Sequence, residues 1–255
     1  MGNFKNININ EKIQNLYINK KYYYKLNPRK LKTNNYWKVS IDPEGKKRLR
    51  TSKKEFINFN FNQKYLVDFI NNQKPLKLLD IGCGIGYLLS NISDKHKKFG
   101  MEIDKSTYEI ASRFAEISIG ELKKINYQEN FFDLIVCHHV IEHVAKPEFM
   151  IREIKRILKN KGILAIGTPD FDSAAARRYK NKYRLLDDPT HISLFSNDSM
   201  HRFLRDNNFD IFRTEYPYFD TKYFSKKNLI AMKNKNTISP PFYGNFMTFF
   251  CKNKK

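Results

Sequence analysis

"LLDIGCGIGYLL", residues 78–89, joins an apolar run to a cluster of glycines. The apolar run predicts a buried strand, and Gly82, Gly84 and Gly86 follow it directly. Glycine lets the backbone turn sharply and approach a ligand closely. A dinucleotide-binding loop of the pattern G-x-G-x-x-G would have its last glycine at position 87, where this chain has Tyr87. The stretch therefore predicts a ligand-binding turn that does not need a pyrophosphate.

An acidic residue, Glu102, stands sixteen residues after Gly86. "KKFGMEID", residues 97–104, predicts the next strand, and Glu102 stands near its end. An acidic side chain at the end of the second strand can accept hydrogen bonds from the hydroxyls of a ribose. Together, the glycines and Glu102 predict a cofactor that carries a nucleoside.

Strands and helices are expected to alternate outward from this point, which predicts a parallel, doubly wound sheet with ligands at the carboxyl ends of its strands. Strands are expected at 76–82, 97–104, 117–122, 131–137 and 162–168, and helices at 61–73, from Tyr87 onward, at 105–115 and at 147–160 before the stop signal Asn160-Lys161-Gly162. Beyond Pro169 we expect a helix or lid at 171–184, a helix at 196–208 capped by Ser196, and strands at 209–219 and 245–252.

Residues 75–168 resemble the class I S-adenosylmethionine-dependent methyltransferases, in particular the small-molecule group that includes the ubiquinone-pathway O-methyltransferases. Segments in the same order carry the resemblance: "LLDIGCGIG", "GMEID", "ISIGEL", "FFDLIVCHHVIEHV" and "IREIKRILKNKGILAIGTPD". The resemblance implies a Rossmann-like, doubly wound, mostly parallel seven-stranded sheet with an N-terminal arm and lid insertions. Because residues 1–60 are rich in Asn, Lys and Tyr with little periodicity and the pattern changes after Pro169, we expect a basic arm at 1–60 and a methyltransferase domain at 61–255. Within that domain we expect a cofactor-binding core at 75–168 and an acceptor or lid region at 169–245.

The same resemblance implies S-adenosylmethionine as cofactor. Asp80 would order the first loop near the amino group of the methionine part, Glu102 would hold the ribose diol, and Ile103 would pack on the adenine. Glu121 and Leu122 would meet the adenine edge. The full set of cofactor-binding residues implied in this way is Asp80, Gly82, Cys83, Gly84, Gly86, Glu102, Ile103, Glu121, Leu122 and His138.

"CHHVIEHV", residues 137–144, contains the letters H-x-x-E-H of one class of zinc proteases. In such proteases both histidines lie in mid-helix on one face. Here the string follows the expected strand at 131–137, so His139 comes at the carboxyl end of a strand and Glu142-His143 begin the next element. This context argues against a protease. It also predicts that these side chains lie in the crevice at the carboxyl ends of the strands.

The resemblance also implies that His191, in "DDPTHISLFS" at residues 187–196, joins these side chains, because many relatives carry a similar Asp-x-x-His segment there. The arrangement resembles the small-RNA 3′-end 2′-O-methyltransferases, in which a Glu-x-x-Glu-His segment and a later histidine hold a divalent metal. The ubiquinone-pathway enzymes have a similar string, and this chain departs from both by having His139 at the first position. One hypothesis is that His139, Glu142, His143 and His191 bind a divalent metal ion. With His139 in place of a glutamate, the ligand set carries less negative charge than Mg²⁺ prefers, which favours a borderline metal ion.

Two alternatives need no metal. His143 or His191 could act as the general base for an acceptor hydroxyl while Glu142 orients a neighbour. In the other alternative the histidines merely close the pocket.

Charge and composition limit the partners. The net charge is +21, but residues 1–75 carry 17 Lys or Arg against 5 Asp or Glu, and residues 222–255 carry 8 against none, so the middle of the chain is nearly neutral. This distribution disfavours nucleic acid and leaves room for a phosphate-bearing acceptor beside a basic arm. The cysteines Cys83, Cys137 and Cys251 are too few and too far apart to predict a disulfide framework. No apolar run of membrane-spanning length occurs, so we expect a cytoplasmic protein.

The function expected from these features is O-methylation of a small molecule such as a sugar, a nucleotide sugar or a glycan precursor. The strings that mark the DNA amino-methyltransferases and the cytosine-C5 enzymes are absent after the expected strand at 131–137, where the chain reads Cys137-His138-His139-Val140. Two alternatives stay open. One is ribose 2′-O-methylation of RNA, and the other is a non-catalytic cofactor-binding subunit of a larger complex.

Overall fold

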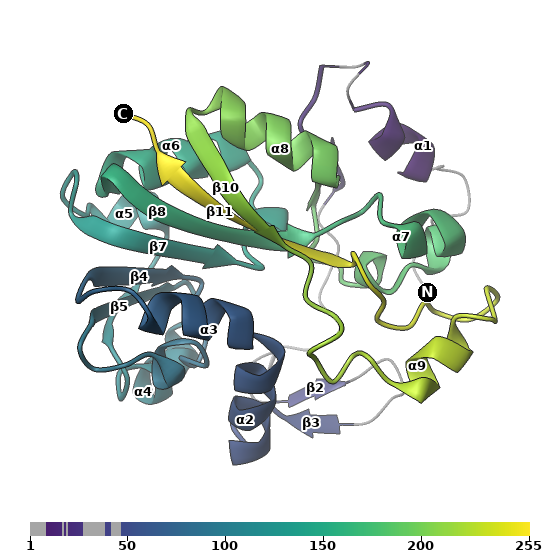
Figure 1. Ribbon diagram of the computed structural model, residues 1–255, viewed down its shortest axis with the longest axis horizontal. Coiled ribbons are helices and arrows are strands. Elements are labelled where there is room, and N and C mark those ends of the chain that lie inside the picture. Colours follow the sequence, from purple (N-terminus) through teal and green to yellow (C-terminus); the bar gives the residue numbers. More distant parts are fainter. Residues whose placement is uncertain (1–8, 17, 19, 28–38, 42–46) are drawn as a thin grey trace.

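A seven-stranded sheet forms the centre of the protein in the computed structural model, which describes residues 9–16, 18, 20–27, 39–41 and 47–255 (Figure 1). Its strand order is β10-β11-β8-β7-β4-β5-β6. The pairs β8–β7, β7–β4, β4–β5 and β5–β6 are parallel, whereas β11 is antiparallel to both β8 and β10. The predicted fold class is confirmed. The strands are β4 (Lys77–Ile81), β5 (Lys97–Glu102), β6 (Glu116–Ile119), β7 (Phe132–His138), β8 (Leu158–Pro169), β10 (Phe209–Glu215) and β11 (Phe246–Asn253).

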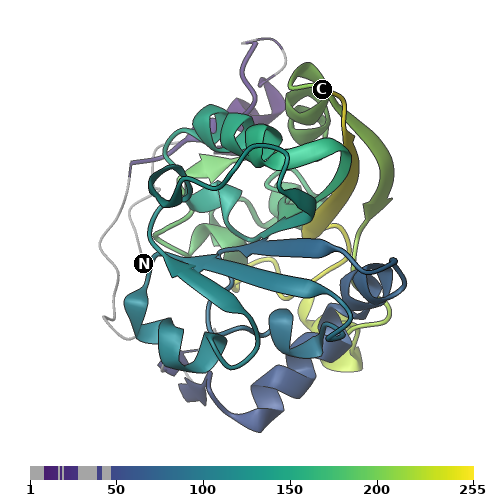
Figure 2. The same ribbon diagram turned by 90° about the vertical axis from the view of Figure 1, so that its left-hand side faces the viewer.

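Helices cover both faces of this sheet, as Figures 1 and 2 show. Successive side chains of a strand point to opposite faces, so Leu78 packs with α3 (Lys64–Asn71) while Leu79 packs with α6 (Pro147–Ile157) and α8 (Asn197–Asp206). Both leucines are fully buried. Burying one such side chain contributes about 1.5–3 kcal/mol to the free energy of folding. Strands that are apolar on both faces therefore stabilise the packing of helices on both sides of the sheet.

The helix predicted from Tyr87 does not form. Residues 82–88 are mostly turns, and a single 3₁₀ turn follows at Leu89–Asn91. The hydroxyl of Ser90 and the amide of Asn91 both donate to the carbonyl of Tyr87, at 2.9 Å and 2.8 Å. In a regular helix that carbonyl would accept from a backbone N–H four residues later, so these local side-chain hydrogen bonds compete with the helix.

Other predicted helices differ at their ends. The helix expected at 61–73 is two helices, α2 (Lys53–Asn62) and α3, which meet at Gln63. The segment expected at 105–115 forms a 3₁₀ turn at Lys105–Thr107 and a short α4 (Tyr108–Ala111). Ser196 does cap α8, because its side chain accepts from the N–H of Ser199 and the Ser199 hydroxyl accepts from the N–H of Ser196. The prediction of that cap is therefore confirmed.

The helix α6 ends earlier than the stop signal at Asn160-Lys161-Gly162 predicts. It stops at Ile157, and β8 begins at the next residue. The side-chain amide of Asn253 on β11 donates to the carbonyls of Lys155, Leu158 and Lys159, all at 3.2 Å. Carbonyls at a helix end need donors from outside the helix. A residue nearly a hundred positions away supplies them here, which a local glycine signal could not reveal.

The first part of the chain packs against the region that follows β8. Ile9, Ile13 and Leu16 are buried in one cluster with Phe171 and Tyr183. The elements involved are α1 (Ile9–Gln14), β1 (Tyr24–Lys25), which pairs antiparallel with β9 (Ser193–Leu194), and α7 (Ala174–Tyr179). A separate antiparallel pair is formed by β2 (Val39–Ile41) and β3 (Lys47–Leu49).

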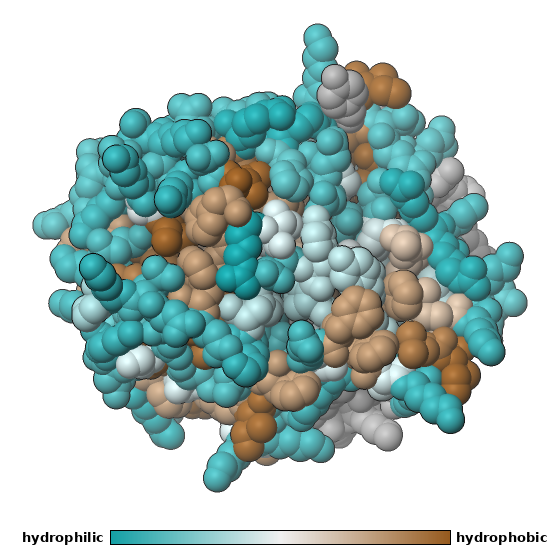
Figure 3. All heavy atoms as spheres, in the orientation of Figure 1, coloured by the Kyte–Doolittle hydropathy of each residue, from teal (hydrophilic) through white to brown (hydrophobic). Residues whose placement is uncertain are grey.

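Short elements complete the fold: α5 (Leu122–Ile125), α9 (Lys226–Ala231) and 3₁₀ turns at Ile141–His143, Lys180–Lys182 and Arg184–Leu186. Hydrophobic side chains gather at the lower right of Figure 3, where Figure 1 places α9, and Leu229 and Ile230 of that helix are exposed. Within the described part of the chain, no helix has the length and apolar character that crossing a membrane requires.

Candidate functional site

The glycine loop has a backbone that only glycine adopts without strain. Gly82, Gly84 and Gly86 have φ angles of +72°, +54° and +86°. A Cβ atom built on Gly82 would lie 2.4 Å from a methyl group of Val140, so both conformation and space require glycine there. The N–H groups of Gly82 and Cys83 donate to the carbonyl of Met101 on β5, at 2.8 Å and 3.0 Å. The loop is thereby tied to the end of the next strand.

Glu102 closes the same loop from the end of β5. Its Oε2 accepts the N–H of Gly84 at 2.9 Å, and its Oε1 accepts the N–H groups of Ile103 and Asp104 at 2.8 Å and 3.2 Å. A carboxylate offers about four lone-pair positions, so these bonds occupy both positions of Oε1 and one of Oε2. The structure thus leaves Oε2 the better acceptor for a ligand hydroxyl, and a diol would have to share or displace a backbone donor.

The other residues expected around the cofactor differ in exposure. Ile103 is 70 % exposed, so its side chain is free to contact a ligand beside the glycine loop. Asp80 is buried, and this burial, followed by the nearby charge of Glu102, raises its pKa to about 8. Cys83 and Leu122 are buried in the two main hydrophobic clusters, so only their backbones can face a ligand. Glu121 pairs with Lys124 at 3.2 Å in solvent.

His138, the last residue of β7, points to the α3 face of the sheet. Its Nε2 lies 2.8 Å from the Thr248 hydroxyl and 3.2 Å from the Tyr65 hydroxyl, and these two hydroxyls are 2.8 Å apart. Its ring occupies the space where a Cβ of Gly167 would lie, at 2.1 Å from the built atom. Burial, followed by the proximity of His139, lowers the pKa of His138 well below its usual value. A neutral, hydrogen-bonded imidazole therefore lines this part of the crevice.

The remaining site residues meet at the carboxyl end of β7. One ligand-capable atom from each of Glu142, His143 and His191 lies within 4.8 Å of the other two, and we call these residues the Glu142 cluster. Glu142 and His143 come from the 3₁₀ turn Ile141–His143, and His191 comes from the segment before β9. The N–H of Ile192 donates to the carbonyl of Glu142 at 2.8 Å and holds the two segments together.

The proton positions on both histidines of the cluster follow from their partners. Nδ1 of His143 is 3.1 Å from the carbonyl of Thr190, and Nδ1 of His191 is 2.5 Å from the carbonyl of Leu185. A carbonyl oxygen only accepts, so Nδ1 carries the proton in each ring. In the neutral imidazoles, Nε2 then has a free lone pair. That is the state that a general base or a metal ligand requires.

Glu142 is the anion of this cluster. Its side chain is fully buried, its Oε2 accepts from the Thr168 hydroxyl at 3.1 Å, and its Oε1 lies 3.4 Å from Nδ1 of His139 and 4.0 Å from Nε2 of His143. Burial alone would raise the pKa of Glu142, but the hydrogen bond with His139 and the interactions with His143 and His191 lower it to about 2. Burial lowers the pKa of His191. The cluster thus combines an ionised buried carboxylate with an imidazole that burial keeps neutral.

The four residues predicted as metal ligands do not form one group. His139 reaches Glu142 but is not part of the set whose atoms lie mutually within 4.8 Å. Its φ of +57° turns the chain out of β7, and its ring contacts those of His138 and Phe246, with centroids 4.6 Å and 5.0 Å apart. The structure therefore places His139 between the Glu142 cluster and β11.

Sequence reasoning missed two residues beside the site. Oδ2 of Asp188 lies 4.0 Å from Nε2 of His191, and the interaction with His191 contributes to the lowered pKa of Asp188 against the effect of burial. The Asp-x-x-His spacing in "DDPTH" could have indicated it. Tyr65 is the other, and no sequence signal links it to His138, 73 positions away.

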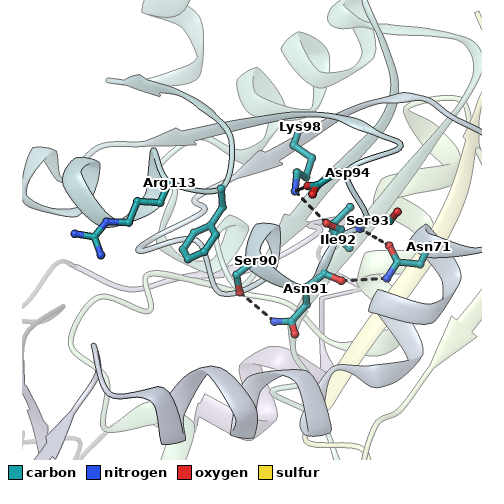
Figure 4. Close-up of a pocket in the computed structure, with 9 residues that line it drawn as sticks. Asn71, Ser90, Asn91, Ile92, Ser93, Asp94, Lys98 and Arg113 are labelled. Carbon is teal, nitrogen blue, oxygen red and sulfur yellow. Dashed lines mark hydrogen bonds and ion pairs between the residues drawn. The ribbon is translucent and has the colours of Figure 1, made fainter.

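A cavity lies away from this site (Figure 4). It has a volume of about 390 Å³, and Asn71, Asp94 and Lys98 are among the residues that line it. Lys98 pairs with Asp94 at 2.7 Å and is the second residue of β5, whereas Glu102 is the last. The cavity thus sits at the amino end of that strand, on the side opposite to the cofactor loop.

Known proteins resemble this chain in sequence and in fold. Residues 46–214 match a family model described as a methyltransferase domain. The ubiquinone biosynthesis O-methyltransferase of Coxiella burnetii is 33% identical over 115 residues, which cover 39% of this chain and 47% of that protein. The chain spans about a third to three fifths of the length of other curated relatives, with 58%, 34% and 50% covered in three of them.

Solved structures share the fold at low sequence identity. A S-adenosylmethionine-dependent methyltransferase of Thermotoga maritima superimposes with a TM-score of 0.58 at 20% identity, covering 79% of this chain and 94% of that one. The complex of the Trm112 methyltransferase activator with a methyltransferase of Haloferax volcanii gives 0.62 at 12% identity, covering 80% and 93%. Both likenesses concern the fold.

Proposed function

The chain belongs to the class I S-adenosylmethionine-dependent methyltransferases, and we propose that it methylates a hydroxyl oxygen of a small molecule such as a sugar, a nucleotide sugar or a glycan precursor. The observation that carries this proposal is the Glu142 cluster, in which Nδ1 of His143 and Nδ1 of His191 each face a backbone carbonyl, so that the neutral form of either ring has its free lone pair on Nε2. A hydroxyl acceptor must lose a proton during transfer, and these nitrogens are suited to take it.

S-adenosylmethionine supplies an electrophilic methyl group on a positively charged sulfur. We propose that the backbone of the loop from Gly82 to Gly86 approaches it, that Oε2 of Glu102 accepts a ribose hydroxyl and that Ile103 covers the adenine. The remaining contacts carried over by resemblance are Asp80, Cys83, Glu121, Leu122 and His138. The positive φ angles of the loop and the exposed Ile103 beside Glu102 support this assignment because both suit a ligand that packs closely on the backbone.

In the metal-free mechanism, the protein holds the acceptor and removes its proton. Nε2 of His143 or of His191 takes the proton from the acceptor hydroxyl, and the ionised Glu142 stabilises the imidazolium that results. The Nδ1 hydrogen bonds to the carbonyls of Thr190 and Leu185 keep both rings oriented while this happens. His139, 3.4 Å from Glu142, would share the same carboxylate.

The same residues also fit a divalent metal ion. Two imidazole nitrogens with free lone pairs and one ionised carboxylate form the donor set of catalytic zinc sites with an open position. A buried carboxylate without a positive partner is costly, and an ion would neutralise Glu142. Bound there, the ion would lower the pKa of an acceptor hydroxyl. We propose Glu142, His143 and His191 as its ligands, with His139 in contact with Glu142 rather than as a fourth member of the set.

We also propose that the acceptor carries a phosphate group, and two alternative functions would bring other partners. A phosphate-bearing acceptor would suit the basic excess in residues 1–75 and 222–255. Ribose 2′-O-methylation of RNA is the alternative that the resemblance to the small-RNA enzymes favours. A role as a cofactor-binding subunit is the other alternative, and the Haloferax volcanii neighbour is itself bound to an activator.

One assay separates these functions. The protein is incubated with S-adenosylmethionine labelled in the methyl group and with a fractionated cell extract, and the labelled fraction is identified. Label in nucleotide sugars or glycan precursors supports the proposal. Label in RNA, together with binding that weakens steeply with salt, supports the RNA alternative. Tight cofactor binding with no labelled fraction supports the subunit. Exhaustive chelation during the assay distinguishes the metal mechanism, which loses activity, from the metal-free one, which keeps it.

A further inference from the structure

A small cavity lies next to the carboxyl end of β8, outside the residues assigned above. Its volume is about 280 Å³, and Asp170, Asp172, Tyr216, Tyr243 and Gly244 are among the residues that line it. This volume lies at the lower end of the range for small-molecule pockets, so it suits one chemical group or one ring rather than a large ligand. The bond from the N–H of Asp170 to the carbonyl of Asn245, 2.9 Å long, fixes its two sides to each other.

Asp170 contributes an incompletely bonded carboxylate to this cavity. It is only 8 % exposed, and its Oδ1 accepts the N–H groups of Asp172 and Asn197 at 2.8 Å and 3.3 Å. Among the residues that the structure describes, none donates a hydrogen bond to its Oδ2. Asp172, by contrast, has both carboxylate oxygens bonded to Arg177, at 3.0 Å and 2.6 Å. The charge of Arg177 also acts on Asp170, but the hydrogen bonds that the structure describes for its guanidinium go to Asp172, so Asp170 is the carboxylate that keeps an oxygen for a ligand.

Two aromatic rings stand beside this carboxylate. The Tyr216 hydroxyl accepts from the side-chain amide of Asn197 at 2.7 Å, and the N–H of that same asparagine binds Asp170, so Tyr216 is held next to the carboxylate. The ring of Tyr243 is 6.0 Å from that of Tyr216 at an angle of 52°, and it is 44 % exposed. A Cβ built on Gly244 would meet no atom within 4 Å, so open space adjoins these rings.

We propose that this cavity binds a protonated amine or quaternary ammonium group of the methyl acceptor. The negative faces of aromatic rings attract cations, and a desolvated carboxylate with a free oxygen adds a full charge to that attraction. A neutral hydroxyl would gain one hydrogen bond there but would bring no positive charge to Asp170. An amino sugar or an amino alcohol would carry both the cation and a hydroxyl to be methylated.

Chain neighbours of Asp170 contact the Glu142 cluster. Phe171 follows Asp170, and its ring is 5.8 Å from that of His191. Thr168, two residues before Asp170, donates to Glu142. The inference rests on the proposed function only in naming the ligand as the acceptor, because binding in the cavity can be measured without methyl transfer.

The ionisation of Asp170 gives this binding a pH signature. Burial raises the pKa of Asp170 to about 6, against the hydrogen bonds that lower it. The charged or titratable groups that face it are Asp172, Arg177, Tyr183, Tyr216 and Tyr243; the pKa values of Arg177, Tyr183 and Tyr216 are all raised. A cation binds the ionised form, so its affinity should rise by about tenfold between pH 5 and pH 7, by linkage to one proton.

Ligand-observed NMR with two matched probe pairs tests this inference. Choline is compared with 3,3-dimethylbutan-1-ol, which has the same shape without the charge, and glucosamine is compared with glucose. We expect the cationic member of each pair to bind at least tenfold more tightly, and more tightly at pH 7 than at pH 5. Equal binding of both members, or tighter binding of the neutral one, would overturn the inference and indicate a site for neutral hydroxyls. Absence of binding by all probes would overturn it too.

Variants place the binding in this cavity. Asp170→Asn removes the charge, Tyr243→Leu removes an aromatic face, and Gly244→Asn fills the open space with a residue that tolerates the φ of +75°. Each should weaken choline binding at least tenfold, and cofactor binding checks that each variant is folded. The controls are Phe219→Leu and Asp210→Asn. The ring of Phe219 is 5.4 Å from that of Tyr243 but does not line the cavity, and Asp210 pairs with Lys254 away from it.

Binding that survives all three cavity variants would contradict the site. The outcome is also distinguishable from failure of the proposed function. If the labelled-methyl assay finds no small-molecule product while choline still binds and Asp170→Asn abolishes that binding, only the proposed function fails. If transfer to a small molecule occurs and the cation preference is missing, only this inference fails.

Discussion

The hydroxyl of Thr168 on β8 donates a 3.1 Å hydrogen bond to Oε2 of Glu142, and both side chains are fully buried. This bond fixes one oxygen of the carboxylate, so that the other, Oε1, faces His139 and His143. A threonine of the sheet thereby orients the only carboxylate of the Glu142 cluster.

Thr168→Val should lower the free energy of unfolding by about 1.5–3 kcal/mol, because it keeps the shape and leaves a buried charged acceptor without its donor. Denaturant unfolding measures this. Thr168→Ser is the control that keeps the hydroxyl, and it should lose less. Little or no loss in Thr168→Val, with a larger loss in Thr168→Ser, would mean that packing of the methyl group, rather than the hydrogen bond, matters at this position.

Gly82→Ala should be more destabilising than Gly244→Ala. Both positions have φ near +75°, which costs an alanine about 1–2 kcal/mol. Only at Gly82 does the new Cβ meet an atom, the Val140 methyl at 2.4 Å, and overpacking of this kind costs about 1–3 kcal/mol more. Thermal and denaturant unfolding of the pair compare the two effects. Similar losses would show that Val140 moves aside freely.

Glu102→Gln should weaken the binding of S-adenosylmethionine by at least tenfold. The amide group that replaces one oxygen would face backbone N–H groups that now donate to the carboxylate, so the loop at Gly84 and the ligand acceptor are disturbed together. Isothermal titration calorimetry measures the affinity, and Glu109→Gln, on the exposed surface of α4, is the matched control. An unchanged affinity in Glu102→Gln would rule out a ribose contact at this carboxylate.

Asp80 should make the protein without ligand less stable as the pH rises. Its pKa is raised from 3.8 to about 8 in the folded state, so the folded state holds a proton that the unfolded state releases across this interval. The stability that this group contributes is complete below pH 3.8 and is lost as the pH rises to about 8, by at most about 1.4 kcal/mol per pH unit. Asp80→Asn should therefore gain stability relative to the wild type from pH 5 to pH 8. A constant difference over that range would contradict the protonated state.

Local patterns were enough to predict the central sheet and its cofactor loop. The apolar run before Gly82 and the acidic end of β5 are both properties of short segments, and the structure brings Gly84 and Glu102 into direct contact. Ser196 is a local signal as well, since a cap bonds to a residue three positions away. These features depend on residues that are near in the sequence, so the sequence alone could predict them.

Features that depend on distant residues could not be predicted. Asn253 bonds carbonyls at the junction of α6 and β8, and the hydroxyls of Tyr65 and Thr248 bond His138 from two other elements. The absence of a helix after Tyr87 has a local cause, because the side chains of Ser90 and Asn91 bond the carbonyl of Tyr87. Whether they can reach that carbonyl depends on the turn that the glycines form. His191 was placed in the site by resemblance alone, and its distance from Glu142 needed the structure.

The most direct test of the proposed chemistry is the rate of methyl transfer from labelled S-adenosylmethionine to the small-molecule product, measured for the wild type, Glu142→Gln, His143→Ala and His191→Ala. Cofactor affinity is measured beside it. We predict that Glu142→Gln and at least one histidine variant lose about a hundredfold or more in rate while cofactor affinity stays within about twofold, as expected for a lost acid–base or metal-ligand group. Full activity in all three variants would contradict the assignment of the Glu142 cluster to catalysis.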